Sequence, residues 1–156
     1  MMLINKDVFE IFGSSELIID GEGSCIAEDG YAIYAAGDSE VTLNNGYYFS
    51  PVSAVYASKN AVVTIEGGEF KVDGANNPDG DFGRKFTLNL RDKTGNNTGD
   101  NSAIIVKGGK FYKFNPADNA AEGEGTNFVA PGYSSVEEGD WYEVKVGIYN
   151  ELALKA

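Results

Sequence analysis

Residues 54–70 read AVYASKNAVVTIEGGEF, and residues 32–49 read AIYAAGDSEVTLNNGYYF. When each residue n from Ala32 to Tyr48 is paired with residue n + 22, six of the 17 pairs are identical. Residues 13–19 (GSSELII) align with residues 37–43 at an offset of 24, and residues 104–111 (IIVKGGKF) align with residues 63–70 at an offset of 41. The longer offset is predicted to hold either one extra loop or two short coils. A period of 22 to 24 residues with β-branched triplets and a Gly turn is typical of a β-solenoid, in which each coil of the chain stacks on the previous one.

Side chains alternate between the two faces of a strand, so the repeat predicts which positions face inward. The predicted inward columns are Val41, Val63 and Ile104 in one, and Leu43, Ile65 and Val106 in the next. Thr42 and Thr64, which lie between them, are predicted to point outward, and Tyr34 and Tyr56 to be stacked neighbours. Gly46, Gly68 and Gly109 are predicted at the corner where the chain reverses.

The sequence therefore predicts an all-β fold, a short parallel β-solenoid of about four coils with a C-terminal capping β-hairpin. Residues 1–12 are assigned to an N-terminal cap or attachment segment, residues 13–114 to the coils, and residues 115–156 to a C-terminal loop and hairpin cap. Within the coils, residues 73–85 and 92–101 are polar, rich in Gly and Asn, and are predicted to be loop excursions. A β-sandwich also has strands every 8 to 12 residues, but it gives no reason for side chains to repeat in register at 22.

Composition excludes several kinds of site and partner. The 156 residues contain no His and a single cysteine, Cys25, so His-dependent catalysis, His-ligated zinc and an intrachain disulfide are excluded. Twelve Lys and Arg against 24 Asp and Glu give a net charge of −12, which disfavours nucleic acid and anionic membrane surfaces as partners. The N-terminal residues lack a signal-peptide pattern and no 18-residue window is apolar, so we expect synthesis in a cytoplasm without export and without a membrane span.

Two local patterns bear on metal binding and on capping. Asn77, Asp79 and Asp81 have the spacing that begins a calcium loop, but Phe82 stands where an EF-hand has Gly, so a solvated turn is the favoured interpretation and no metal site is assigned. Residues 133–136 and 141–144 are predicted to be the two strands of a hairpin around the turn 137–140. Trp141 or Phe128 of this segment is expected to cover the last coil, while Val8, Phe9, Ile11 and Phe12 could cover the first coil or contact a partner.

The segments VTIEGGEF (63–70) and IIVKGGKFYKFNPADNAAEGEGTNFVAPGYSSVEEGDWYEV (104–144) resemble repeat modules in β-helical structural proteins of tailed bacteriophages, of the head-fibre and tail-appendage type, and related right-handed β-helix surface proteins of bacteria. The resemblance covers about residues 30–146. It implies a right-handed solenoid and a non-enzymatic virion component, a head fibre or capsid decoration. It further implies a homo-oligomer, a trimer or alternatively a dimer, that contacts other virion proteins and is made in the bacterial host. It implies no catalytic residue and no cofactor.

Two alternatives remain beside the structural role. An enzyme that cleaves glycans would use paired carboxylates, for which Glu66, Glu69 and Asp73 near one corner are the candidates. A glycan-binding appendage that contacts host surface glycans, or a bacterial adhesin module, would stack sugars on Tyr47, Tyr48 and Tyr112, predicted to be exposed, together with Trp141. Core or cap packing is the competing interpretation for each ring and is favoured for Trp141.

Overall fold

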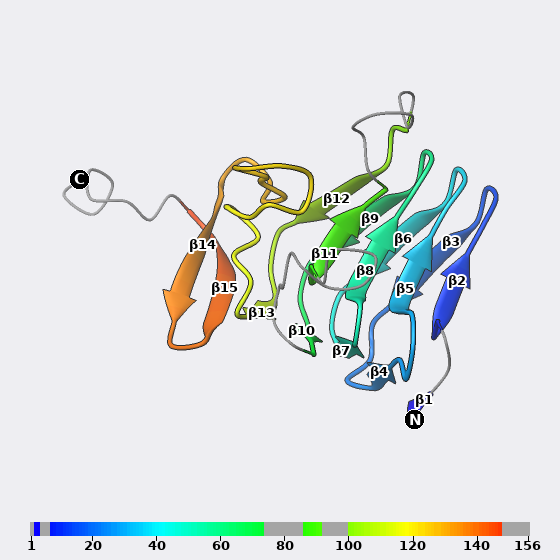
Figure 1. Cartoon of the computed structure of the whole chain (residues 1–156), viewed down its shortest axis with the longest axis horizontal. Coiled ribbons are helices and arrows are strands. Elements are labelled where there is room, and N and C mark those ends of the chain that lie inside the picture. Colours follow the sequence, from blue (N-terminus) through cyan, green and yellow to red (C-terminus); the bar gives the residue numbers. More distant parts are fainter. Residues whose placement is uncertain (1, 4–6, 74–85, 92–99, 148–156) are drawn as a thin grey trace.

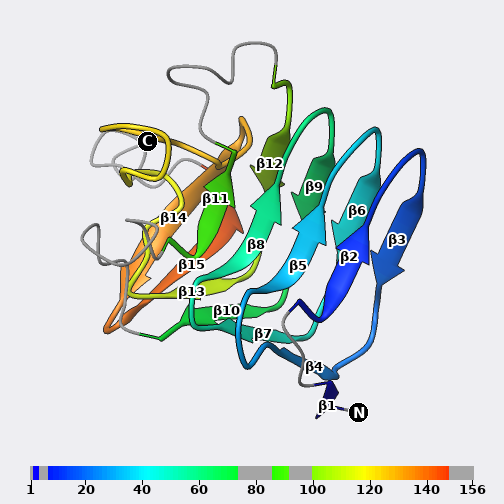
Figure 2. The same ribbon diagram turned by 45° about the vertical axis from the view of Figure 1, so that its right-hand side comes forward.

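The computed structural model describes residues 2–3, 7–73, 86–91 and 100–147. These residues form an all-β structure of three sheets without a helix, and the sheets consist mainly of parallel strands. This arrangement is compatible with a β-solenoid. In Figures 1 and 2 the chain advances from the N-terminal strands at one end of the stack to the C-terminal hairpin at the other.

The chain runs repeatedly through the three sheets. Each such turn, called a passage below, contributes one strand to each sheet, and the C-terminal hairpin then adds two strands to sheet A. Sheet A contains, in spatial order, β1 (Met2–Leu3), β4 (Ser24–Ile26), β7 (Tyr47–Ser50), β10 (Glu69–Val72), β13 (Lys110–Tyr112), β15 (Trp141–Val146) and β14 (Tyr133–Glu138). Sheet B contains β11 (Leu88–Leu90), β8 (Ser53–Ala57), β5 (Tyr31–Ala35) and β2 (Phe9–Ile11). Sheet C contains β12 (Ala103–Val106), β9 (Val62–Ile65), β6 (Glu40–Leu43) and β3 (Glu16–Ile19).

The strand register confirms the offsets read from the sequence. Val41 lies beside Val63 at an offset of 22, and Leu17 lies beside Val41 at an offset of 24. Ile104 lies beside Val63, which makes the offset of 41 a single passage lengthened between β10 and β12. That passage contributes β11, which pairs with β8, so the added residues do not interrupt the ladder. Residues 9–11, assigned from the sequence to the N-terminal segment, also form a strand, parallel to β5.

The core lies between the three sheets and is built from the predicted columns. Val41, Val63 and Ile104 are at most 5% exposed, and Leu43, Ile65 and Val106 are fully buried. A third column, which the sequence alignments contain as Tyr48 with Phe70 and Phe70 with Phe111, is aromatic: the Tyr48 and Phe70 rings stack at a centroid distance of 4.8 Å, and the Phe70 and Phe111 rings at 5.0 Å. We call Tyr48, Phe70 and Phe111 the inner aromatic stack; all three are fully buried.

The corners between strands repeat as strictly as the core. Gly46, Gly68 and Gly109 have φ values of +114°, +107° and +93°, a region that L side chains rarely adopt, which confirms the predicted corner glycines. At the other corner, the Asn60 side-chain amide donates to Asp38 Oδ1 at 2.7 Å, and the Asn101 amide donates to Asn60 Oδ1 at 3.3 Å. Asn101, at the end of the predicted excursion 92–101, therefore stacks on Asn60 and belongs to the corner. Residues 92–99 of this excursion and residues 74–85 of the predicted excursion 73–85 lie outside the described residues.

The C-terminal segment forms the predicted antiparallel hairpin, β14 and β15, and β15 pairs with β13. Its turn is shorter than expected, because Glu137 and Glu138 belong to β14 and only Gly139 and Asp140 connect the strands. Phe128, in the loop that precedes the hairpin, is 6% exposed and joins the core. Among the described residues, no helix is long and apolar enough to cross a membrane.

Candidate functional site

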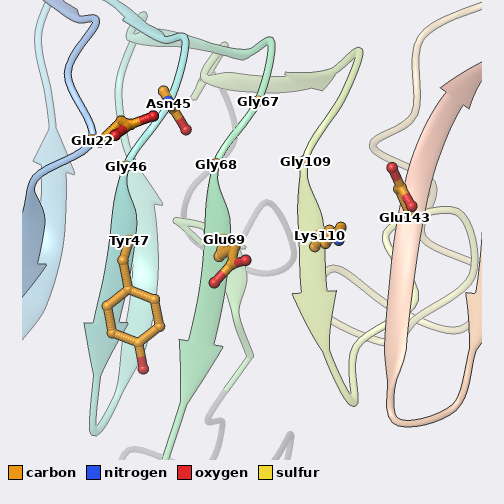
Figure 3. A pocket seen from close by; sticks show the side chains of 10 residues that line it. All are labelled: Glu22, Asn45, Gly46, Tyr47, Gly67, Gly68, Glu69, Gly109, Lys110 and Glu143. Carbon is orange, nitrogen blue, oxygen red and sulfur yellow. The ribbon is translucent and has the colours of Figure 1, made fainter.

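An open groove follows the glycine corner on the outer side of sheet A. Its volume is about 430 Å³. Gly46, Gly68 and Gly109 contribute backbone to its lining. The remaining lining residues are Glu22, Asn45, Tyr47, Gly67, Glu69, Lys110 and Glu143, whose side chains, where they have one, are drawn in Figure 3.

The strand register places four groove residues in one row across sheet A. Tyr47 pairs with Glu69, Glu69 with Lys110, and Lys110 with Glu143. Burial, followed by the Glu69 carboxylate, raises the pKa of Tyr47, which therefore carries a neutral phenol at pH 7. Three carboxylates against one ammonium give the groove an acidic balance, so it attracts cations more than anions. Glu143 also lies 3.7 Å from the Lys145 ammonium.

The three carboxylates predicted as an enzymatic set do not converge. Glu66 lies 3.9 Å from Lys107, and Glu69 lines the groove. Asp73 follows the opposite end of β10, about 13 Å of extended chain from Glu69, whereas carboxyl pairs of glycosidases lie roughly 5–9.5 Å apart. The prediction that these acids share one corner is therefore wrong for Asp73, because the strand separates it from the glycine turn. Among the residues that the structure describes, no group of three or more His, Cys, Asp or Glu could hold a metal ion.

The four aromatic residues predicted to stack on sugars have different surroundings. Tyr47 lines the groove. Tyr48 is fully buried, so its prediction as an exposed ring is wrong; strand alternation turns it inward, in register with Phe70. Tyr112 is half-buried, with the Lys71 ammonium 4.5 Å from its centroid and the Trp141 ring packed edge-on at 5.3 Å. A ring face already occupied by an ammonium is a poor platform for a sugar.

A second aromatic group lies on the outer side of sheet B. We call Phe12, Tyr31, Tyr34 and Tyr56 the outer aromatic patch. The Tyr56 ring stacks on Tyr31 at 4.7 Å and on Tyr34 at 5.4 Å, which confirms the predicted pair Tyr34 and Tyr56. Phe12 lies 5.6 Å from Tyr34 and is 52% exposed. The sequence prediction of sites does not include this patch, although the recurrence of Tyr at an offset of 22 was the available signal.

Burial has a chemical consequence for the patch and for the single cysteine. It is the main cause that raises the pKa values of Tyr31 and Tyr56, so their phenols stay neutral at pH 7. Burial also raises the pKa of the Cys25 thiol, which lies beside Tyr48 in the register and is therefore a weak nucleophile. The calcium-like spacing at Asn77, Asp79 and Asp81 lies outside the described residues.

No family model, curated protein or solved structure matches the chain.

Proposed function

We propose that the chain is a non-enzymatic structural module, a short right-handed parallel β-solenoid of about four coils whose C-terminal hairpin covers one end. The observation that carries the proposal is the content of the repeat. What recurs in register is inward aliphatic side chains, stacked rings and corner glycines, as in Val41 with Val63 and Gly46 with Gly68. These residue types serve packing and chain reversal, so the repeated unit has the composition of a scaffold.

The hairpin supports the capping part of the proposal. β15 adds to sheet A in the antiparallel direction after β13, and Val144 on it is only 4% exposed. The loop before the hairpin contributes the buried Phe128. Its backbone forms two hydrogen bonds with Val106: Val106 N–H donates to the Phe128 carbonyl at 2.9 Å, and Ala130 N–H donates to the Val106 carbonyl at 3.0 Å. A change from parallel to antiparallel pairing interrupts further stacking of coils and protects the exposed edge.

The motif that carries the phage resemblance has structural partners throughout. In the segment GTNFVAPGY (125–133), the Thr126 hydroxyl donates to the Gly123 carbonyl at 2.7 Å, and the Asn127 side-chain oxygen accepts from Val129 N–H at 2.8 Å. These contacts give the motif a role in shaping the covering loop. A virion fibre or capsid decoration is the role that the resemblance implies for such a module.

A structural module of this kind is proposed to act as a homo-oligomer, with a trimer favoured and a dimer as the alternative. Association of copies buries the outer faces of the sheets, which one chain leaves in contact with solvent. We expect light scattering after size-exclusion chromatography, at micromolar protein, to give two or three times the 16.7 kDa chain mass. A single-chain mass at all concentrations tested contradicts the oligomer and with it the fibre.

A further inference from the structure

We infer that Asn45 is a self-modification site, at which the side-chain amide is converted to a carboxylate through attack by the Gly46 backbone nitrogen. Asn45 and Gly46 form the one Asn-Gly dipeptide in the sequence. Such a dipeptide closes a five-membered cyclic imide more readily than Asn before any other residue, because Gly has no Cβ to obstruct the attacking nitrogen. The inference adds a covalent reaction to the glycine corner and does not depend on oligomer formation.

The corner leaves both reacting groups free of competing hydrogen bonds. Among the residues that the structure describes, neither the Asn45 side chain nor the Gly46 N–H forms a hydrogen bond. Asn44 is different, since its side-chain amide donates to Asp20 Oδ1 at 3.1 Å. Asn45 and Gly46 are half-buried and line the open groove (Figure 3), so water can reach the amide and ammonia can leave.

The stacked corners confine the reactive dipeptide to one passage of the chain. By extension of the strand register, Gly67 is the neighbour of Asn45, and a Cβ at Gly67 would lie 2.5 Å from the Asn44 carbonyl oxygen. A Cβ at Gly108, the next neighbour, would collide with the Glu66 carbonyl. Gly46 has a φ of +114°, which L side chains rarely adopt. The fold therefore requires Gly at position 46 and accepts a side chain before it in this passage, but not in the next two.

The buried Tyr48 hydroxyl activates the attacking nitrogen. It donates to the Asn45 carbonyl at 2.7 Å, and this carbonyl belongs to the same peptide group as the Gly46 N–H. When the nitrogen loses its proton, negative charge spreads onto the carbonyl oxygen, and a donor already aimed at that oxygen stabilises the charge. Tyr48 is fully buried within the inner aromatic stack, so the donor is held in place before the reaction.

The reaction consumes only water. The Gly46 nitrogen gives its proton to solvent and bonds to Asn45 Cγ, and the Cγ–Nδ2 bond breaks to release ammonia. Water then opens the cyclic imide at either of its carbonyls. Opening at Cγ breaks the new bond to nitrogen and gives aspartate, whereas opening at the backbone carbonyl gives isoaspartate, whose main chain is longer by one carbon. No group is oxidised or reduced, and the net change is hydrolysis of the amide to a carboxylate and ammonium.

The product changes both the groove and the corner. Glu22 is the register neighbour of Asn45 in the preceding passage, and both residues line the groove. Either product places a second carboxylate beside Glu22, and like charges directly opposite each other destabilise a sheet. Isoaspartate also lengthens the corner and displaces the carbonyl that accepts from Tyr48. We therefore expect the modified chain to unfold at a lower urea concentration than the unmodified chain.

The first experiment incubates the folded chain at pH 8 in water labelled with heavy oxygen and maps its peptides by mass spectrometry. We expect Asn45 to incorporate the label at least about tenfold faster than Asn44 or Asn60, and an isoaspartate-specific methyltransferase to label the same peptide. The matched variant Asn45→Gln should not react, because Gln would have to close a larger ring. If Asn45 reacts no faster than Asn44, or stays unmodified in the folded chain while it reacts in urea, the inference is overturned.

The second experiment uses Tyr48→Phe to test the activation. We expect Asn45 to react several-fold more slowly in the folded variant and at an unchanged rate in urea, with circular dichroism to check the fold. A general loosening of the corner would speed the reaction, so the sign separates activation from a structural role. An equal or faster rate in the folded variant overturns the role of Tyr48. Should the variant fail to fold, a wild-type rate at Asn45 that is lower in the folded chain than in urea overturns it.

Discussion

The inner aromatic stack, on the inner side of sheet A, and the outer aromatic patch, on the outer side of sheet B, both bring aromatic rings of neighbouring strands into stacked contact. Ring centroids are 4.8 and 5.0 Å apart in the inner stack, and 4.7 and 5.4 Å apart between Tyr56 and its two outer neighbours. The inner spacings and the Tyr34–Tyr56 spacing follow from parallel strands about 4.8 Å apart, which bring equivalent side chains of successive passages together. Tyr31 is different, because it pairs with Ser53 in the register and contacts the Tyr56 ring diagonally. Stacking is therefore a consequence of the repeat wherever aromatic residues recur in register. The burial of the rings decides how much each group contributes to the free energy of unfolding.

Replacing a ring with alanine is expected to lower the free energy of unfolding much more in the inner aromatic stack than in the outer aromatic patch. Phe70 lies between Tyr48 and Phe111 and is fully buried, so Phe70→Ala leaves a cavity with rings on both sides. We expect a loss of about 3–5 kcal/mol in the free energy of unfolding, measured by urea denaturation. A loss below about 1 kcal/mol would contradict the view that this stack holds successive passages together.

The matched outer truncation is Tyr34→Ala. Its ring is half-buried in one chain, so we expect a loss of about 1 kcal/mol within the monomer. Denaturation at two protein concentrations separates this loss from a loss of contact between copies, because only the second depends on concentration. If Tyr34→Ala costs as much as Phe70→Ala at low concentration, the outer aromatic patch stabilises the single chain as strongly as the inner aromatic stack does.

The next expected effect concerns the glycine corner that borders the inner stack. A Cβ at Gly68 would lie 3.0 Å from the Gly46 carbonyl oxygen and 3.3 Å from both the Tyr48 and Phe70 rings, at a φ of +107°. We expect Gly68→Ala to cost about 2–4 kcal/mol, from backbone strain and displaced rings.

Gly13→Ala is the control for that corner. Gly13 has a φ of +68°, and a Cβ there meets nothing within 4 Å, so only the backbone penalty of about 1 kcal/mol applies. Thermal unfolding of both variants measures the difference. Equal losses would show that the corner is strained without supporting the rings, and would remove the proposed link between corner and stack.

The sequence repeats were sufficient to predict the parallel strands and their register wherever the repeated phrases align. Parallel stacking sets equivalent residues side by side, so the identity of Val41 with Val63 and of Tyr34 with Tyr56 is direct evidence of contact. The offset of 41 left the number of passages open. The structure resolves it through β11, which has no counterpart in the repeated phrase and was recognisable only by its pairing with β8.

The candidate sites were less predictable, because they depend on whether a side chain points to the inner or the outer side of its sheet. Tyr47, Tyr48 and Phe49 are consecutive aromatic residues, and alternation alone does not say which of them is inside. The alignment of Tyr48 with Phe70 indicated that an aromatic residue recurs at this position, as apolar residues recur at the core positions. The prediction of an exposed Tyr48 did not use this recurrence. The groove could not be predicted, because Glu143 reaches the row of Tyr47, Glu69 and Lys110 through an antiparallel strand outside the repeat.

The smallest effect tests the one polar atom of the inner stack. The Tyr48 hydroxyl donates to the Asn45 carbonyl at 2.7 Å, while Phe70 and Phe111 occupy the same column without a hydroxyl. We expect Tyr48→Phe to cost about 1 kcal/mol at pH 8, the usual net value of such a hydrogen bond.

The same variant should respond differently to alkaline pH. Burial, and secondarily Cys25, raises the pKa of Tyr48 in the folded chain above its ordinary value of 10.0, so folding favours the neutral phenol. The stabilisation from this group is complete below pH 10 and is lost above it, by about 1.4 kcal/mol per pH unit, because the unfolded chain releases the proton first. The variant has no phenol to ionise at this position, so the stability advantage of the wild-type chain should vanish near pH 11, as measured by urea denaturation at pH 8, 10 and 11. A gap that stays constant over this range would mean that the Tyr48 hydroxyl is open to water in the folded state.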